Sequence, residues 1–319
     1  MTLEIDRRQF LTQAAAASLA AAAVPHVHSA EVAAMPIIDT HQHLWDISKF
    51  KLAWMKPGTK LNRNFLSDDY KKATEGLNVV KAVYMEVDVE PSQQGDELEA
   101  ILELIRGGKT PTAAAVVSGR PASEGFGEWV ARLKKSKEIK GIRQVLHGPS
   151  TPNGYCLDPK FVKGMKTLGE SGLMFDLCIR PADLLNAAKL IHDCPGTNFI
   201  LDHCGNPEFL AQDTFRQWKS DLDKLADNDN VVCKVSGIVA SLEGKSWKPD
   251  DLAPVVNHVL DAFGPDQVMF GGDWPVCTLG ASFKEWVAAL KTIVSDRPAV
   301  LQNKLFHGNA SRVYGLETS

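Results

Sequence analysis

The chain has 319 residues, of which 44% are hydrophobic, and its 35 basic and 39 acidic residues leave a formal net charge of -4. This apolar fraction is that of an ordinary globular protein, and a mildly acidic balance without a basic stripe argues against nucleic acid as a partner. The six cysteines are scattered and contain no C-x-x-C pair, so we expect buried thiols rather than a disulfide framework.

The first 34 residues predict an export signal. Arg7 and Arg8 precede an apolar, alanine-rich stretch over residues 14–24, and small residues follow, with cleavage expected after Ala30 or Ala34. This order is typical of a twin-arginine signal, and an N-terminal anchor or amphipathic helix is the alternative. The stretch is too short and too rich in alanine for a membrane span. We therefore expect a periplasmic or otherwise exported protein with no stable membrane insertion once the signal is removed.

After residue 34, strand-like and helix-like segments alternate. Continuous Val, Ile and Leu runs predict buried parallel strands at Ile37–Asp39, Val79–Val87, Ala113–Val117, Ile139–Val145, Met174–Cys178, Asn198–Leu201, Val231–Val235 and Gln267–Gly271. Helical patterns lie between them, at Gly95–Arg106, Glu124–Lys135, Pro159–Ser171, Pro181–Asp193, Asp213–Ala226 and Pro249–Ala262. The alternation predicts an α/β fold, a (β/α)8 TIM barrel in one domain over residues 35–319. A doubly wound sheet would also alternate, but no G-x-G-x-x-G follows the first strand.

Two histidines end the first predicted strand. His41 and His43 are two residues apart, so in extended backbone they share one face. Both imidazoles can converge on a metal ion or a substrate carbonyl at the end of the strand. Two solvated loop histidines are the alternative. The long segment over residues 48–66 follows, and a loop of this length is typical of a pocket wall.

Polar side chains gather at the ends of the other predicted strands as well. They include Glu86, Asp88, Arg143, His147, Asp176, Arg180, Asp202, His203, Lys234, Ser236, Asp273 and Trp274. Packing of an apolar core does not explain polar side chains at the ends of nearly all the predicted strands. Because barrel enzymes hold their catalytic groups at the carboxyl ends of the strands, the pattern indicates an active site there.

The order and spacing of these motifs resemble the amidohydrolase superfamily, and within it the branch that contains sugar lactonases and pyrone-dicarboxylate lactonases. The motifs are IDTHQHLWD at 38–46, GIR at 141–143, LDHCGNP at 201–207, KVSG at 234–237, FGGDWPV at 270–276 and FHGNA at 306–310. The likeness covers about residues 36–316. It implies a barrel like that of the metal-dependent hydrolases and a hydrolase that opens a lactone ring.

The resemblance also implies roles for individual residues. Asp273 would be the general base for the attacking water, and His203 and Arg143 would bind or polarise the carbonyl. A structural histidine and an ion pair inside the barrel remain the alternatives for His203 and Arg143. The side chains expected to bind substrate are His41, His43, Trp45, Arg180 and Trp274.

The motifs are compatible with a site that binds one metal ion and with a site that binds none. One divalent ion such as zinc would be held by His41, His43, Asp273 and Glu86, and a lactonase without metal is the alternative. Binuclear members of the superfamily carry a bridging lysine or glutamate on strand 4 and a histidine on strand 5. This chain has Arg143 and Asp176 at those ends, so we expect no binuclear centre.

The expected substrate is a small neutral sugar lactone. Few cationic residues end the strands, whereas Trp45, Trp54, Tyr155, Trp247 and Trp274 offer aromatic faces suited to a sugar ring, although some of them would simply pack against the barrel. Three alternatives stay open: an anionic lactone of aromatic pathways (pyrone dicarboxylate or muconolactone type), a metal-dependent decarboxylase or amide hydrolase, and a non-catalytic sugar-binding barrel. No oligomeric state is predicted.

Overall fold

The computed structural model describes residues 35–316. The predicted export signal at residues 1–34 lies outside the described residues, as do residues 317–319. Within the described range, no helix combines the length and the apolar character needed to cross a membrane.

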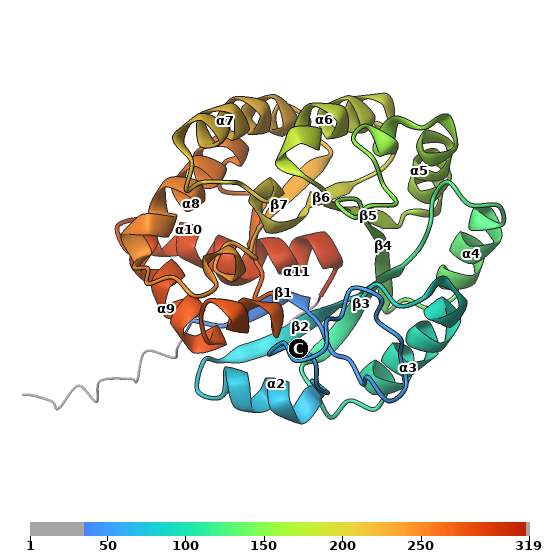
Figure 1. The fold of residues 1–319 in the computed structure, drawn as a ribbon, viewed down its shortest axis with the longest axis horizontal. Helices are drawn as coiled ribbons and strands as arrows, with labels where there is room; N and C mark the ends of the chain where they lie inside the picture. The colour runs from blue at the N-terminus through green and yellow to red at the C-terminus, as the bar shows by residue number, and fades with distance from the viewer. Residues whose placement is uncertain (1–34, 317–319) are drawn as a thin grey trace, which may run out of the picture. The chain divides into compact units, whose positions relative to one another are not determined.

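The strands form one parallel sheet of eight in sequential order, β1 to β8. They are β1 (Ile37–Gln42), β2 (Val79–Met85), β3 (Thr112–Ser118), β4 (Ile139–Val145), β5 (Met174–Cys178), β6 (Phe199–Leu201), β7 (Val231–Val235) and β8 (Val268–Phe270). The first and last strands are adjacent and close the barrel. Gln42 forms a parallel β-bridge with Trp274, and Thr40 Oγ1 donates a hydrogen bond of 2.6 Å to the carbonyl of Phe270. The predicted (β/α)8 barrel is confirmed (Figure 1).

Most of the helices form a ring around the strands, and α11 lies across the middle of the barrel (Figure 1). They are α2 (Ser67–Thr74), α3 (Gln94–Arg106), α4 (Phe126–Leu133), α5 (Pro159–Ser171), α6 (Leu184–Asp193), α7 (Gln212–Ala226), α8 (Pro249–Phe263), α9 (Phe283–Ile293), α10 (Ala299–Asn303) and α11 (Asn309–Tyr314). Asp158 caps α5 by accepting a hydrogen bond from the amide of Lys160, and Ser282 caps α9 through Glu285. These caps satisfy amide groups that have no partner within the helix.

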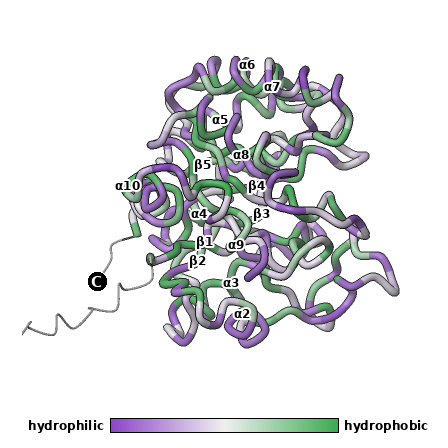
Figure 2. Tube along the Cα trace, turned by 90° about the vertical axis from the view of Figure 1, so that its left-hand side faces the viewer, coloured by the Kyte–Doolittle hydropathy of each residue, from purple (hydrophilic) through white to green (hydrophobic). Residues whose placement is uncertain are grey.

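Two apolar cores account for the continuous apolar runs of the strands. One core fills the barrel and includes Ile38, Val116 and Met269, with Ala310 and Tyr314 of α11 closing it. The other lies between the strands and the surrounding helices. Figure 2 shows hydrophobic residues along the strands and hydrophilic ones on the outer segments. A strand buried on both faces has no polar side to alternate with.

Asp39 joins β1, β8 and α2 below the mouth of the barrel. Its Oδ1 accepts hydrogen bonds from the amides of His41 (3.0 Å) and Gly272 (2.7 Å), and its Oδ2 accepts one of 2.8 Å from Tyr70. β1 continues to Gln42, three residues beyond the predicted end, so His41 lies within the strand. The backbone that carries the histidine pair is therefore fixed to the strand that precedes Asp273.

Candidate active site

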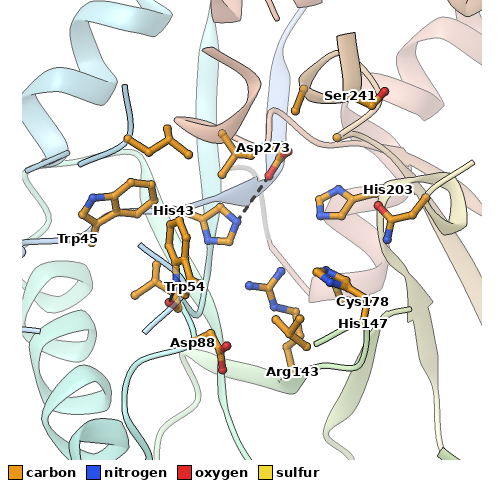
Figure 3. Close-up of a pocket in the computed structure, with 17 residues that line it drawn as sticks. His43, Trp45, Trp54, Asp88, Arg143, His147, Cys178, His203, Ser241 and Asp273 are labelled. Atoms are coloured by element: carbon orange, nitrogen blue, oxygen red, sulfur yellow. Dashed lines mark hydrogen bonds and ion pairs between the residues drawn. The ribbon is translucent and has the colours of Figure 1, made fainter. Parts of the chain in front are cut away.

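A cavity of about 450 Å³ opens at the carboxyl ends of the strands (Figure 3). Of the side chains proposed from the sequence, His43, Trp45, Arg143, His203 and Asp273 line it. Trp54 and Leu61, from the long segment after β1, line it as well, so this segment is part of the pocket wall as predicted. His41 is completely buried beside the cavity and reaches the same centre through its ring nitrogens.

Asp273 is the centre of the cluster. Its Oδ1 lies 3.6 Å from Nε2 of His43 (Figure 3). The same oxygen lies 3.8 Å from Nε2 of His41. His43 Nδ1 lies 3.0 Å from the carbonyl oxygen of Met85, and a carbonyl only accepts. The proton of His43 is therefore on Nδ1, and Nε2 turns a lone pair toward Asp273.

His41 presents a lone pair in the same direction. Nη1 of Arg143 lies 3.4 Å from Nε2 of His41, and a guanidinium only donates. The proton of His41 is therefore on Nδ1, which lies 3.3 Å from Oδ1 of Asp202. Two imidazole lone pairs and a carboxylate thus face one another around Asp273, an arrangement that requires a shared proton or a cation.

His203 contributes a third imidazole from the loop after β6. Its ring lies 4.4 Å from that of His41, and its Nδ1 lies 2.9 Å from Oγ of Ser236 at the end of β7. The backbone of Gly237 passes next to the ring with φ +70°, and a Cβ atom there would lie 2.5 Å from Nδ1. Ser236 and Gly237 therefore hold His203 in place.

Arg143 is both paired inside the barrel and exposed to the cavity. Its Nε and Nη2 donate to Oε1 and to the carbonyl oxygen of Glu86, each at 2.7 Å. The other carboxylate oxygen of Glu86 accepts a hydrogen bond of 2.7 Å from the amide of Asp88. Both oxygens of Glu86 are thus occupied. Glu86 therefore positions Arg143, and it is absent from the group of His41, His203 and Asp273 whose ligand atoms lie together, contrary to the expectation that it would be a metal ligand.

Lys234 is completely buried and does not line the cavity. Its Nζ lies 2.5 Å from Oδ2 of Asp176 and 3.2 Å from Oδ1 of Asp202. Burial raises the pKa of Asp176 to about 7. Burial acts in the same direction on Asp202, but Lys234 and His41 together hold the pKa of Asp202 well below its usual range. Asp202 is therefore a fixed anion behind His41.

Burial sets the charge of the groups around the cavity. It lowers the pKa of His43 to about 3, and it lowers the pKa values of His41 and His203 as well. All three imidazoles are neutral near pH 7. Burial raises the pKa of Asp273 to about 6, so this carboxylate is mainly ionised at neutral pH and still basic enough to accept a proton.

The donor set fits one divalent cation. His41, His203 and Asp273 each offer a ligand atom, and these atoms lie within 4.8 Å of one another. Carboxylates also outnumber cations among the buried side chains at the strand ends: Asp39, Glu86, Asp176, Asp202 and Asp273 against Arg143 and Lys234. A divalent ion would offset this excess, and neutral imidazole and carboxylate are ligands that zinc accepts.

Some side chains expected at the site lie elsewhere. Arg180 does not line the cavity: it donates to the carbonyls of Leu146 and Gly148 and thereby holds the loop after β4. Trp274 is buried and packs edge-on against Phe65. Both residues shape the rim through the backbone, which corrects the expectation that they contact substrate.

The aromatic side chains divide in the same way. Trp45 and Trp54 line the cavity and meet edge-to-face, with ring centres 5.4 Å apart. Tyr155 packs against Phe161, and Trp247 donates to the carbonyl of Gly280, so neither reaches the cavity. Two of the five aromatic side chains considered from the sequence therefore form a wall of the cavity.

Left-handed backbone is concentrated at the mouth. Five of the six non-glycine residues with positive φ in the described range follow strand ends there: Asp88, His203, Cys204, Asn206 and Asp273. Each costs roughly 1–3 kcal/mol, and such strain collects at functional sites. The contacts of His203 with Ser236 and of the Asp88 amide with Glu86 hold two of these residues against that cost.

A TIM barrel with an imidazole and carboxylate cluster at the carboxyl ends of its strands has the architecture of a barrel enzyme. The sequence profile of the amidohydrolase family matches residues 38–316 of this chain. The chain therefore belongs to the amidohydrolase family.

Relatives within this family are similar over nearly the whole described chain. The L-fucono-1,5-lactonase of Burkholderia multivorans is 30% identical over 293 residues, which cover 88% of this chain and 96% of that protein. The L-rhamnono-gamma-lactonase of Scheffersomyces stipitis is 23% identical and covers 88% of this chain and 98% of its own. An amidohydrolase of Burkholderia multivorans, solved with bound zinc, matches with a TM-score of 0.79 at 27% identity, over 88% of this chain and 100% of that chain.

Proposed function

We propose that this protein is a lactonase that hydrolyses a neutral sugar lactone. The observation that carries the proposal is the Asp273 carboxylate, raised in pKa to about 6 and facing the Nε2 atoms of His41 and His43 inside a cavity of ligand size. Arg143 and His203 line the same cavity, and Arg143 supplies a hydrogen-bond donor there. The similarity to two sugar lactonases supports the same activity.

The reaction follows from these positions. Asp273 takes a proton from water as the water oxygen attacks the lactone carbonyl carbon. Arg143 donates a hydrogen bond to the oxyanion that forms on the carbonyl oxygen. The intermediate then collapses, the bond from the carbonyl carbon to the ring oxygen breaks, and the proton on Asp273 passes to the leaving alkoxide. The product is an open-chain hydroxy acid, which ionises at neutral pH.

Zinc is the proposed cofactor. His41, His203 and Asp273 would hold it, with His43 beside them. When bound, the ion would act as a Lewis acid toward the carbonyl and lower the pKa of a bound water. The bound zinc in the similar Burkholderia multivorans amidohydrolase supports this assignment.

The neutral sugar substrate rests on the lining of the cavity. Trp45 and Trp54 offer apolar ring surface, which suits the C–H faces of a sugar. The cation that lines the cavity, Arg143, already binds Glu86 through two of its nitrogens. The side chains that line the cavity therefore offer no uncommitted positive charge to the anionic substituent of a lactone.

A screen of lactone hydrolysis followed with a pH indicator tests the proposal. The mature protein is assayed on aldonolactones and on aromatic-pathway lactones, before and after chelation and after zinc is restored. We expect turnover of an aldonolactone, loss on chelation and recovery with zinc. No turnover of any lactone would exclude the proposed function and would favour a decarboxylase, an amide hydrolase or a binding protein.

Asp273→Asn tests the assignment of the base. Loss of a general base lowers kcat by about 10²- to 10⁴-fold, and binding of the lactone measured by calorimetry should persist. Because Asp273 is also a proposed zinc ligand, the loss is compared between variant and wild-type samples of equal zinc content. Asp250→Asn is the matched control, because Asp250 lies on α8 with 83% of its side chain exposed. Full activity of Asp273→Asn would exclude the mechanism.

We also propose that the protein is exported by the twin-arginine route. The support is the Arg7-Arg8 pair followed by the alanine-rich stretch. Replacement of both arginines by lysine should retain the protein in the cytoplasm, as measured by cell fractionation and immunoblotting. Unchanged fractionation would contradict this proposal.

A further inference from the structure

Asp88 is a carboxylate that lines the cavity and takes no part in the proposed reaction. It follows β2 in left-handed backbone, with φ 49°. Its amide donates a hydrogen bond of 2.7 Å to Oε2 of Glu86, so its backbone is tied to the residue that positions Arg143. Figure 3 shows Asp88 near Arg143 and Trp54, on the side of the cavity away from Ser241.

Arg120 fixes the side chain of Asp88. Nη2 of Arg120 donates a hydrogen bond of 2.8 Å to Oδ1 of Asp88, and its Nη1 donates to Oγ of Ser118 and to the carbonyl of Gly119. Arg120 does not line the cavity. Oδ2 of Asp88 has no hydrogen-bond partner among residues 35–316, so one carboxylate oxygen is held in a fixed position and free to accept.

Other polar groups of the lining are acceptors too. Asn206 donates through Nδ2 to the carbonyl of Ile179, which leaves its Oδ1 free. Ser241 donates its hydroxyl proton to the carbonyl of Ile238, which leaves its lone pairs. A ligand that pairs with the acceptors of Asp88, Asn206 and Ser241 must bring hydrogen-bond donors. Sugar hydroxyls are such donors, and a carboxylate substituent is not.

We propose that Asp88, held by Arg120, is a specificity-determining residue that selects lactones by their hydroxyl groups and rejects those with a carboxylate. Its Oδ2 accepts hydrogen bonds from substrate hydroxyls, and its negative charge repels an anionic substituent on the same side. The inference rests on the proposed lactonase function and adds to it the residue that discriminates between neutral and anionic sugar lactones.

Three lactones separate the two effects. Galactono-1,4-lactone is neutral, and galactaro-1,4-lactone differs from it by a carboxylate at the end of the chain. δ-Valerolactone has no hydroxyl groups and reports on the reacting groups alone. The wild-type protein should prefer galactonolactone over galactarolactone in kcat/KM by at least about tenfold, since a like charge weakens binding in a cavity of low dielectric.

Asp88→Asn tests the residue without changing its shape, because asparagine accepts left-handed backbone as readily as aspartate. We expect kcat/KM on galactonolactone to fall about tenfold to a hundredfold, mainly through KM, as for the loss of a hydrogen bond to a charged acceptor. The loss on δ-valerolactone should be at least tenfold smaller. The preference for galactonolactone over galactarolactone should fall or reverse.

Two further variants serve as a second test and a matched control. Arg120→Gln leaves the charge of Asp88 and removes its fixed partner, so KM for galactonolactone should rise while galactarolactone remains disfavoured. Glu90→Gln removes one negative charge two residues from Asp88. Glu90 does not line the cavity and pairs with Lys51 at 4.0 Å, so the substrate preference should stay that of the wild type.

The outcomes distinguish this inference from the proposed function. Equal loss on all three lactones, or an unchanged preference in Asp88→Asn, would overturn the role of Asp88 and leave the lactonase function standing. A wild-type preference for galactarolactone would overturn it as well. Absence of hydrolysis of any lactone would overturn both.

Discussion

Oδ1 of Asp202 lies 3.3 Å from Nδ1 of His41, and both side chains are completely buried. Because this carboxylate faces the protonated nitrogen, the other nitrogen of His41 is left to face Asp273 at 3.8 Å. A carboxylate behind an imidazole fixes both the tautomer and the orientation of the ring. The tautomer of His41, and with it the lone pair that faces Asp273, thus depends on Asp202, which does not line the cavity.

Asp202→Asn should lower kcat/KM about 10- to 100-fold, since the amide keeps the shape but removes the anion that faces Nδ1 of His41 and Nζ of Lys234. Steady-state kinetics on the best lactone measure the effect, and the zinc content of the purified variant is measured in parallel. Asp221→Asn is the control, because Asp221 is also buried and paired with Lys224, but lies on α7. Equal activity of both variants would contradict the role of Asp202.

Lys234→Met should destabilise the fold by about 3–5 kcal/mol, because it leaves the carboxylate of Asp176 buried without its cation and leaves Asp202 only Arg143, at 3.7 Å. Urea unfolding measures the change. Lys224→Met, at a site 58% exposed, should change stability by less than about 0.5 kcal/mol. Adding Asp176→Asn to Lys234→Met should recover part of the loss, and failure to do so would show that the charge is not the cause.

Glu97 predicts a pH dependence of stability. Burial raises its pKa from 4.5 to about 8, and its Oε1 accepts hydrogen bonds from Tyr84 and the amide of Val87. Between these two values the folded state keeps a proton that the unfolded state has lost, so stability falls as pH rises from about 4.5 to about 8. The slope approaches about 1.4 kcal/mol per pH unit.

Glu97→Gln should remove this slope, as measured by urea unfolding at several pH values between 5 and 8. Glu99→Gln on the same helix is the control, since the side chain of Glu99 is 64% exposed and pairs with Arg132. Its slope should parallel that of the wild type. If Glu97→Gln kept the full slope, another buried group would be responsible.

Gly237→Ala should impair catalysis more than stability. The new Cβ would lie 2.5 Å from Nδ1 of His203, so the ring must move, and we expect kcat/KM to fall at least about tenfold. Gly244→Ala is a matched control, because Gly244 has φ +72° and no atom within 4 Å of the new Cβ. Both variants should lose about 1 kcal/mol of stability from the left-handed backbone. Equal kinetics for the two would contradict the positioning of His203.

Zinc should saturate at one ion per chain. A second group of candidate ligands, Cys178, Asp202 and His203, also lies within 4.8 Å. However, Lys234 already pairs with Asp202, and burial raises the pKa of Cys178, so its thiolate is disfavoured. Elemental analysis after stripping and reloading measures the ratio. Cys178→Ser should keep one equivalent and His41→Asn should lose it, and two equivalents in the wild type would contradict this prediction.

The sequence by itself was enough to predict the barrel and the ring of polar residues at its mouth. Continuous apolar runs reveal strands buried on both faces, and a barrel brings all carboxyl ends of its strands to one side. His41, His43, His203, Arg143 and Asp273 could therefore be assigned to one site without coordinates. The same position at a strand end is shared by Asp88, Asp202, Ser236 and Gly237. The sequence does not show which of these residues contact the side chains of the site.

Only the tertiary structure decided how these residues pair. Arg143 binds Glu86, 57 positions away in the sequence, and Lys234 binds Asp176 across 58. Arg180 has the same place at a strand end as Arg143, yet it holds a loop instead of facing the cavity. The partner of a buried charge depends on distances of a few ångströms between strands that are neighbours only in space, because Coulomb attraction and desolvation both change steeply over that range.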